Sequence, residues 1–220
     1  RELMKDADAV TSWIMERCRR GALSPYGIGA AIYAQADAGD LDPEEATLLV
    51  RSLLSAGVDT TIDSIGLCLR LLAEHPEQWA MLRREPDLAR SAFEEATRFD
   101  SSSQSLFRTT LEDCEFQGVQ LRKHQKVLVL IGAAGRDPAK WADADRFDIT
   151  RRVAAGQIGY GAGIHSCVAQ MMARLEAEVF LRALARKVRD IEVIGPARLR
   201  LQPGLRGLTS LPLRLTRNTS

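Results

Sequence analysis

The sequence predicts a mainly helical protein with small antiparallel β-sheets. In the first hundred residues, apolar side chains recur at the spacing of one helix face, segment after segment. After a polar loop that begins at Ser101, the chain alternates apolar and polar residues around turns, as short strands do. Residues 191–215 alternate in the same way and contain a Pro203-Gly204 turn. We expect one domain over residues 1–220.

Composition limits the classes of function. The 220 residues are 45% hydrophobic and 27% charged, as in soluble globular proteins, and the net charge of +1 argues against a nucleic-acid partner. No apolar run reaches the ~18 residues of a spanning helix, and the first residues do not form a signal peptide. The four cysteines show no paired spacing, so Cys18, Cys68 and Cys114 are interpreted as structural thiols. We therefore expect a cytoplasmic protein without membrane attachment.

A long helix is expected to begin at Pro43. Asp42 supplies an N-cap, Pro43 suits the first turn, and no further proline occurs before Pro76. The apolar face of this helix is interrupted by small residues, an acid and two hydroxyls over residues 55–61. A glycine there costs about 1 kcal/mol relative to alanine, so a local widening or kink is expected. Taken alone, this segment is a packing notch with an exposed acid.

A later helix, after Pro76, carries Glu95 and Arg98 three residues apart. Residues at this spacing share one face of a helix, and on a surface such a pair contributes only about 0.2–0.5 kcal/mol. Strand-like segments follow, at residues 104–110, 114–121 and 126–131. Arg108 lies on the first of them, where an arginine is ordinarily a solvated strand residue.

Residues 158–170 form a glycine-rich loop that delivers Cys167 to the beginning of a helix. Gly159, Gly161 and Gly163 alternate before it, and glycine permits positive φ and close approach to a flat ligand. From Val168 onward the apolar residues follow a helical period. A helix N-terminus favours the thiolate, which is the form that binds a metal.

The pattern Tyr-Gly-x-Gly-x-His-x-Cys, from Tyr160 to Cys167, resembles the haem-binding loop of the cytochrome P450 family, the haem-thiolate monooxygenases. The similarity extends over almost the whole chain, although Ala169 stands where the family usually has glycine. It implies that Cys167 is the axial ligand of the iron of haem b. It also implies that Tyr160, Gly161, Gly163 and His165 bind the cofactor.

The same resemblance assigns the interrupted helix to dioxygen activation. Ala56 and Gly57 would leave room for dioxygen and substrate over the haem. Thr60 would hydrogen-bond the dioxygen, and Asp59 would help to relay protons to it. On the first strand, Arg108 falls where the family places an arginine that binds a haem propionate, and a guanidinium suits a carboxylate.

The resemblance also gives Glu95 and Arg98 a structural role. The family has a Glu-x-x-Arg pair on a helix beneath the haem, with a further arginine from the meander before the cysteine loop. Arg146 matches that position, although Ala144 stands where the family often has proline. The expectation is a buried network of Glu95, Arg98 and Arg146 that fixes the loop holding Cys167.

The implied activity is insertion of one oxygen atom of O2 into a small organic substrate. Within the family, the similarity is to soluble bacterial members that oxidatively demethylate para-substituted benzoic acids, so an aromatic acid that is demethylated or hydroxylated is expected. Ser102, Ser103 and Leu106 differ from the proline and bulky apolar residues of that group. The expected redox partners are a ferredoxin-type donor and an NAD(P)H-dependent reductase.

The resemblance covers the C-terminal half of the family fold, because a complete member is close to twice this size. Residues 1–220 are therefore expected to be a single, incomplete domain: the long central helix, the Glu-x-x-Arg helix, the meander, the cysteine loop and the helix after it. The alternative to an enzyme is a truncated, non-catalytic haem-binding fragment. A helical interaction protein would leave the Gly-Gly-His-Cys spacing unexplained.

Overall fold

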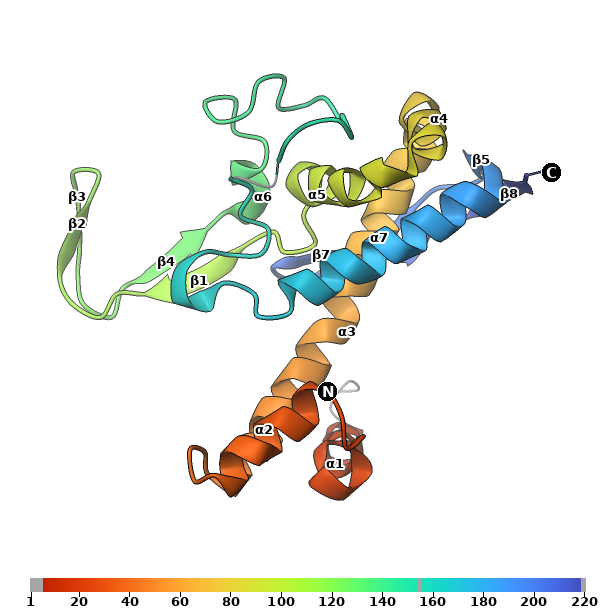
Figure 1. The fold of residues 1–220 in the computed structure, drawn as a ribbon. Helices are drawn as coiled ribbons and strands as arrows, with labels where there is room; N and C mark the ends of the chain where they lie inside the picture. The colour runs from red at the N-terminus through yellow and green to blue at the C-terminus, as the bar shows by residue number, and fades with distance from the viewer. Residues whose placement is uncertain (1–5, 154–155, 219–220) are drawn as a thin grey trace. The chain divides into compact units, whose positions relative to one another are not determined.

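The computed structural model describes residues 6–153 and 156–218 of the chain. It contains two compact units, residues 1–59 and 60–220. Figure 1 shows the ribbon, with the long helix α3 (Pro43–Glu74) contributing to both units. The expectation of a single domain over residues 1–220 stays a prediction.

The first unit is entirely helical in its described part. It consists of α1 (Ala7–Cys18), a 3₁₀ turn (Arg20–Ala22), α2 (Ile28–Asp37) and the beginning of α3. Its small core comprises Cys18, Tyr33, Ala46 and Val50. The buried Tyr33 hydroxyl donates to the carbonyl oxygen of Cys18 at 2.8 Å, so the ring is both packed and satisfied as a donor.

Helix α3 is continuous over 32 residues, and its predicted beginning is confirmed. The backbone N–H of Glu44 donates to the Asp42 carboxylate at 2.7 Å, as an N-cap requires. The widening expected over residues 55–61 is wrong, because this segment is α-helical throughout, whereas the alternative of a kink stays a prediction. The cost of one glycine, about 1 kcal/mol, is too small to interrupt a helix whose turns on both sides are well formed.

The second unit packs four helices around its main core. These are the C-terminal half of α3, α4 (Pro76–Arg84), α5 (Ala89–Phe99) and α7 (Gln170–Lys187), with α5 packed on α7. The core includes Leu71, Leu72, Trp79, Leu82, Phe93, Phe147, Ile149 and Leu181. The meander before the cysteine loop thus contributes Phe147 and Ile149 to the same core as the helices, which fixes its position.

Four antiparallel two-stranded sheets complete the described part of this unit. Their strand pairs are β1 (Leu106–Thr109) with β4 (Lys126–Val129), β2 (Cys114–Phe116) with β3 (Val119–Leu121), β5 (Val188–Val193) with β8 (Leu213–Arg217), and β6 (Arg198–Gln202) with β7 (Leu205–Ser210). The short helix α6 (Ile131–Ala134) follows β4. Gly204, at φ 76°, lies in the turn that connects β6 to β7, as predicted. The predicted fold class, mainly helical with small antiparallel sheets, is confirmed.

Of the helices in the described part of the chain, none combines the length and the apolar character needed to cross a membrane.

Candidate functional site

The cysteine loop has the backbone that its glycines predict. Gly161 and Gly163 adopt positive φ, 73° and 67°. The N–H of Cys167 donates to the carbonyl oxygen of Tyr160 at 2.8 Å, which closes the loop on itself. Gly159 serves a different purpose, because a Cβ at this position would stand 2.6 Å from Cγ2 of Thr97. Close approach to α5 therefore requires glycine there.

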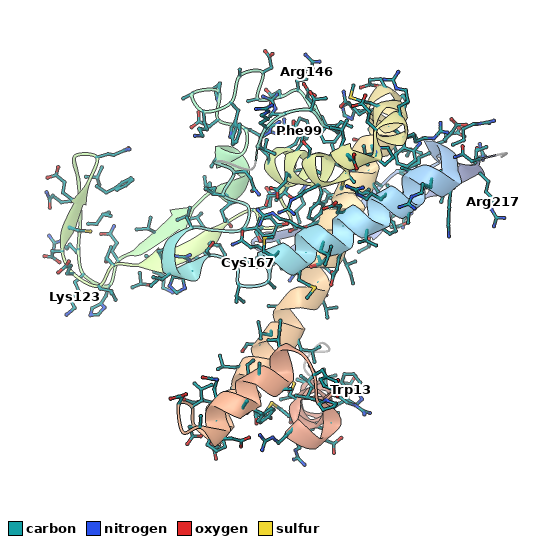
Figure 2. All side chains as sticks on the ribbon, viewed as in Figure 1. Trp13, Phe99, Lys123, Arg146, Cys167 and Arg217 are labelled. Carbon is teal, nitrogen blue, oxygen red and sulfur yellow. The ribbon has the colours of Figure 1, made fainter. Side chains whose placement is uncertain are left out.

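Cys167 is a free, half-buried cysteine that precedes α7 (Figure 2). The helix begins at Gln170, with Ala169 as its N-cap, rather than at Val168 as predicted. Val168 and Ala169 form a turn, and the N–H of Gln170 points to the carbonyl oxygen of Cys167 at 3.4 Å. The thiol therefore lies just before the positive end of the α7 helix dipole.

Tyr160 attaches the loop to the protein rather than extending from it. The Arg174 guanidinium stands 4.4 Å from the centroid of the Tyr160 ring. Burial, followed by the nearby Glu94 charge, raises the pKa of Tyr160, so the hydroxyl stays protonated. Glu94 in turn pairs with Arg174 and accepts a hydrogen bond from the Gln157 amide at 2.8 Å. Sequence reasoning missed Glu94, whose one signal is that it is a second acid beside Glu95.

The opposite side of the loop is open and mainly apolar. The Ile164 side chain is 97% exposed and Val168 is 81% exposed. His165 ends the 3₁₀ turn Gly163–His165 and is exposed. Exposed apolar side chains around a single cysteine fit a large, flat, apolar group that carries its own metal.

The side chains that could ligate a metal agree with a flat group that carries its own metal. Among residues 6–153 and 156–218, no cluster of three or more His, Cys, Asp and Glu side chains could hold a metal ion. A bare ion such as zinc would need about four protein ligands. A haem iron brings four nitrogen ligands with it and needs one axial side chain. The single cysteine of the loop therefore fits haem, which needs one axial side chain.

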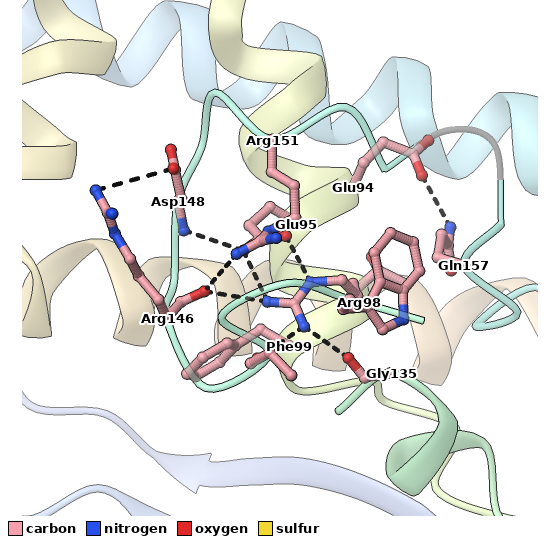
Figure 3. A network of polar contacts seen from close by, with 12 residues as sticks. Glu94, Glu95, Arg98, Phe99, Gly135, Arg146, Asp148, Arg151 and Gln157 are labelled. Carbon is pink, nitrogen blue, oxygen red and sulfur yellow. Dashed lines mark hydrogen bonds and ion pairs between the residues drawn. The ribbon is translucent and has the colours of Figure 1, made fainter. Parts of the chain in front are cut away.

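Beneath the loop, Glu95 and Arg98 form a fully buried ion pair (Figure 3). The guanidinium donates to both carboxylate oxygens, from Nε at 2.7 Å and from Nη2 at 2.8 Å, and both side chains are 0% exposed. The remaining Arg98 donors reach the carbonyl oxygens of Gly135 at 2.6 Å, Ala144 at 2.9 Å and Arg146 at 3.2 Å. One arginine thereby joins α5 to α6 and to the meander.

The expected role of the Arg146 side chain in this network is corrected by the structure. Its side chain is 67% exposed and faces Asp148 at 4.0 Å, while its carbonyl oxygen turns inward to Arg98. The second guanidinium at Glu95 comes from Arg151, whose Nε lies 3.3 Å from Oε1. The physical reason is that the Arg146 backbone is held on both sides, because its N–H donates to the carbonyl oxygen of Asp143 at 2.9 Å and its own carbonyl oxygen accepts from Arg98.

The residues assigned to dioxygen activation lie on consecutive turns of α3. Ala56 and Asp59 are exposed, and Gly57 and Thr60 are half-buried. Outside its own helix, a Cβ at Gly57 would meet no atom of the described residues within 4 Å. Ala56, Gly57 and Asp59 belong to the first unit, and Thr60 begins the second.

Arg108 lies on β1 and is exposed. Its Nη1 donates to the carbonyl oxygen of Phe107, the preceding residue, at 2.9 Å. Its propionate-binding role stays a prediction.

Comparison with known proteins identifies relatives over the same range. The family model described as Cytochrome P450 matches residues 25–189. The chain is 52% identical over 205 residues to "Cytochrome p450 CYP199A2" of Rhodopseudomonas palustris, covering 93% of this chain and 50% of that protein. It is 35% identical to "6-deoxyerythronolide B hydroxylase" of Saccharopolyspora erythraea, covering 95% and 53%.

Solved structures give the same result. "Cytochrome P450 CREJ in complex with (4-ethylphenyl) dihydrogen phosphate" matches with a TM-score of 0.85 and 31% identity, covering 92% of this chain and 52% of that one. The structure of "Cytochrome P450 CYP109Q5 from Chondromyces apiculatus" matches with a TM-score of 0.77 and 29% identity, covering 96% and 55%. The chain thus spans about half the length of the relatives it matches.

Proposed function

Because the chain belongs to the cytochrome P450 family, we propose that it supplies the haem-holding half of a monooxygenase acting on a small organic molecule. One oxygen atom of O2 enters a C–H bond of the substrate, and the other leaves as water after two electrons and two protons are supplied. The observation that carries the proposal is the Cys167 loop. Its inner side is bonded to α5 and α7, and its outer side presents one thiol among exposed apolar side chains.

Family members bind haem b, and several residues of this chain would each contribute a different contact to it. A thiolate-ligated haem supplies the activation of dioxygen. Cys167 holds the iron, Gly161 and Gly163 allow the backbone to approach the ring, and Tyr160 seats the loop on the protein. His165 and Arg108 are exposed basic side chains that suit the propionate carboxylates.

Proton delivery is the proposed role of Asp59 and Thr60. The Thr60 hydroxyl both donates and accepts hydrogen bonds, and the exposed Asp59 carboxylate beside it in the sequence exchanges protons with water. Ala56 and Gly57 keep the adjacent helix surface small, which leaves room for dioxygen and substrate.

For the substrate, we propose a para-substituted aromatic acid that is hydroxylated or oxidatively demethylated. In demethylation, hydroxylation of a methoxy carbon is followed by loss of formaldehyde. The proposal is supported by the 52% identity to CYP199A2 and by the similarity to a structure that holds an aromatic ring with an anionic group in the para position. The electrons would come from NAD(P)H through a reductase and a ferredoxin-type donor in the cytoplasm.

A second candidate function is a haem-binding fragment without turnover. It is favoured by the chain spanning about half the length of its relatives and by the exposed apolar residues around the loop, because a haem pocket must exclude water. We expect residues 1–220 alone to retain haem weakly and to show no coupled monooxygenation when electron donors are added.

The haem assignment is tested on the expressed chain reconstituted with haem. The reduced carbon monoxide adduct should show the red-shifted Soret band of a thiolate ligand, and Cys167→His should abolish it. Cys114→Ser is the control, because Cys114 is also a free cysteine but is exposed on β2. A thiolate band that survives Cys167→His would contradict the proposal.

The catalytic role is tested in an enzyme that combines this chain with the N-terminal half of CYP199A2. Thr60→Ala should divert reducing equivalents to peroxide, and Thr60→Ser, which keeps the hydroxyl, should restore much of the product per NADH. Unchanged product per NADH in Thr60→Ala would contradict the role of this hydroxyl.

A further inference from the structure

One turn beyond Thr60, helix α3 carries a buried carboxylate, Asp63, which is only 4% exposed. A carboxylate is costly to remove from water unless a cation and hydrogen bonds compensate it. Its position within the proposed oxygen-activating helix makes the identity of its partner important.

One partner of Asp63 is Arg200, which lies 137 residues away on β6. Nη2 of Arg200 lies 2.5 Å from Oδ2 of Asp63. Directly across the β6–β7 hairpin from Arg200 is Gly207, where a Cβ would stand 2.1 Å from Oδ1 of Asp63. The carboxylate is therefore seated against the backbone of β7 in a space that only glycine leaves.

The next residue of α3 makes a second connection. The Ser64 hydroxyl donates to the carbonyl oxygen of Thr60 at 2.7 Å and lies 2.8 Å from the Ser102 hydroxyl. The Ser102 carbonyl oxygen accepts from the N–H of Arg206 at 2.7 Å. Thus the loop after α5 is bonded both to the hairpin and to the turn of α3 that contains Thr60.

A third contact holds the hairpin two turns further along the same face of α3. Arg70 donates to the Asp100 carboxylate at 2.6 Å, and Nε of Arg206 lies 3.1 Å from the same carboxylate. Between the two ion pairs, Gly66 faces Leu208 of the hairpin, since a Cβ there would lie 3.8 Å from Cδ1 of Leu208. The hairpin is thus docked along α3 at three successive levels.

We infer that Asp63 is a positioning residue that holds the β6–β7 hairpin, and with it residues 101–104, against the turn of α3 carrying Thr60. Its carboxylate acts through Arg200 and the Gly207 backbone. It thereby fixes the loop and the hairpin strands that lie beside the turn of α3 carrying Thr60. The inference rests on the proposed function in one respect, namely that the Thr60 hydroxyl delivers protons.

The docking is tested by hydrogen exchange on the 220-residue chain, a measurement that needs no haem. Asp63→Asn should raise exchange in β6 and β7 and at residues 60–64 by at least about tenfold, with exchange in α5 unchanged. Gly207→Ala should do the same from the hairpin side, and adding Arg200→Gln to Asp63→Asn should add little. The matched control is Arg214→Gln, because Arg214 pairs with Glu192 where both side chains are more than 60% exposed. Hairpin exchange within about twofold of the parent in both Asp63→Asn and Gly207→Ala would overturn the inference.

The link to Thr60 is tested in the enzyme completed with the N-terminal half of CYP199A2. Asp63→Asn should lower product per NADH several-fold while the KM for substrate changes little. Thr60→Ala, measured in parallel, reports on the proposed function itself. If Thr60→Ala uncouples the reaction and Asp63→Asn does not, the positioning role is overturned and the proposed function stands. If neither variant uncouples it, the proposed proton-delivery role of Thr60 fails, and the link from Asp63 to Thr60 fails with it.

Discussion

The two sides of the Cys167 loop differ in how fully their side chains are buried and paired with other residues of the chain. On the inner side, Glu95 and Arg98 are 0% exposed and make a two-bond ion pair, and Glu94 is paired with Arg174. On the outer side, Ile164 and Val168 are 97% and 81% exposed. The support of the loop is therefore built from residues of this chain, whereas its cover is not.

Helix α7 shows the same contrast along its length. Its inner face buries Ala177 and Leu181, which are 0% and 1% exposed, whereas Leu175 and Val179 on its outer face are 55% and 59% exposed. An apolar face of this size is typical of a surface that another part of a protein covers. This agrees with a chain that spans about half the length of its relatives. The contrast predicts large effects for substitutions on the inner side and small ones on the outer side.

The largest effect is expected for Arg98→Met. The substitution removes five donors and leaves the fully buried Glu95 with Arg151, at 3.3 Å, as its one remaining charged partner among the described residues and with the N–H of Asp148, at 3.0 Å. Unpairing a buried charge of this kind costs about 3–5 kcal/mol. Chemical denaturation of the second unit should show a loss of this size.

The matched control is Arg214→Met, which breaks an ion pair with Glu192 whose side chains are 64% and 61% exposed. Exposed pairs contribute about 0–1 kcal/mol, so the control should be nearly neutral. If the free energies of unfolding of the two variants differed by less than about 1 kcal/mol, the Glu95–Arg98 network would not be what stabilises the inner side of the Cys167 loop.

An intermediate effect is expected for alanine in the loop. Gly161→Ala places a Cβ at φ 73°, 3.2 Å from the carbonyl oxygen of His165, whereas at Gly163, φ 67°, a Cβ meets no atom within 4 Å. The left-handed backbone alone costs an alanine about 1–2 kcal/mol. Gly163→Ala should therefore weaken haem binding by that free energy, and Gly161→Ala should weaken it by more. Gly21→Ala is the control, because Gly21 has neither positive φ nor a neighbouring atom within 4 Å. The measurement is haem affinity; equal affinities in all three variants would contradict it.

Sequence patterns predicted those features whose signals are local. The beginning of α3 follows from Asp42 and Pro43, and the loop backbone follows from Gly161 and Gly163. Both depend on residues within a few positions of one another. The predicted widening of α3 was wrong because it considered only the local cost of glycine. The hydrogen-bonded helix on both sides of residues 55–61 outweighs that cost.

Long-range pairing could not be predicted from one sequence. The sequence contains thirty lysines and arginines, and nothing in it indicates that Arg151 rather than Arg146 turns its guanidinium toward Glu95. The Asp63 and Arg200 pair spans 137 residues, so it depends on the docking of a hairpin that only the fold reveals. Chemistry-bearing residue types were thus predictable, whereas their partners were not.

A smaller effect is expected from Asp148, at the edge of the inner network. A hydrogen bond from the Thr150 hydroxyl, at 2.7 Å, is the main cause that holds the pKa of Asp148 below its ordinary value, and burial opposes it. Because the folded-state pKa is depressed, Asp148 adds stability above the unfolded-state pKa of about 4, and that stability is lost as pH falls through the folded-state pKa. Thr150→Val should reduce stability at neutral pH by about 1 kcal/mol and flatten this acid-side loss.

Thr150→Ser keeps the hydroxyl and should retain the parent's pH dependence. The measurement is the free energy of unfolding between about pH 2 and pH 7. Parallel curves for Thr150→Val and Thr150→Ser would show that this hydroxyl does not set the Asp148 pKa.

The smallest effect on folding is expected on the outer face of α7, and it is the sharpest test of the contrast. Leu175→Ala removes a side chain that is 55% exposed, so the free energy of unfolding should change by no more than about 0.5 kcal/mol. Leu181→Ala, on the same helix but 1% exposed, should lower the free energy of unfolding by about 2–5 kcal/mol.

Self-association should respond in the opposite order, because an uncovered apolar face drives it. Light scattering should show the 220-residue chain as oligomers, which Leu175→Glu with Val179→Lys converts to monomer. A parent chain that is already monomeric would mean that the outer face needs no cover.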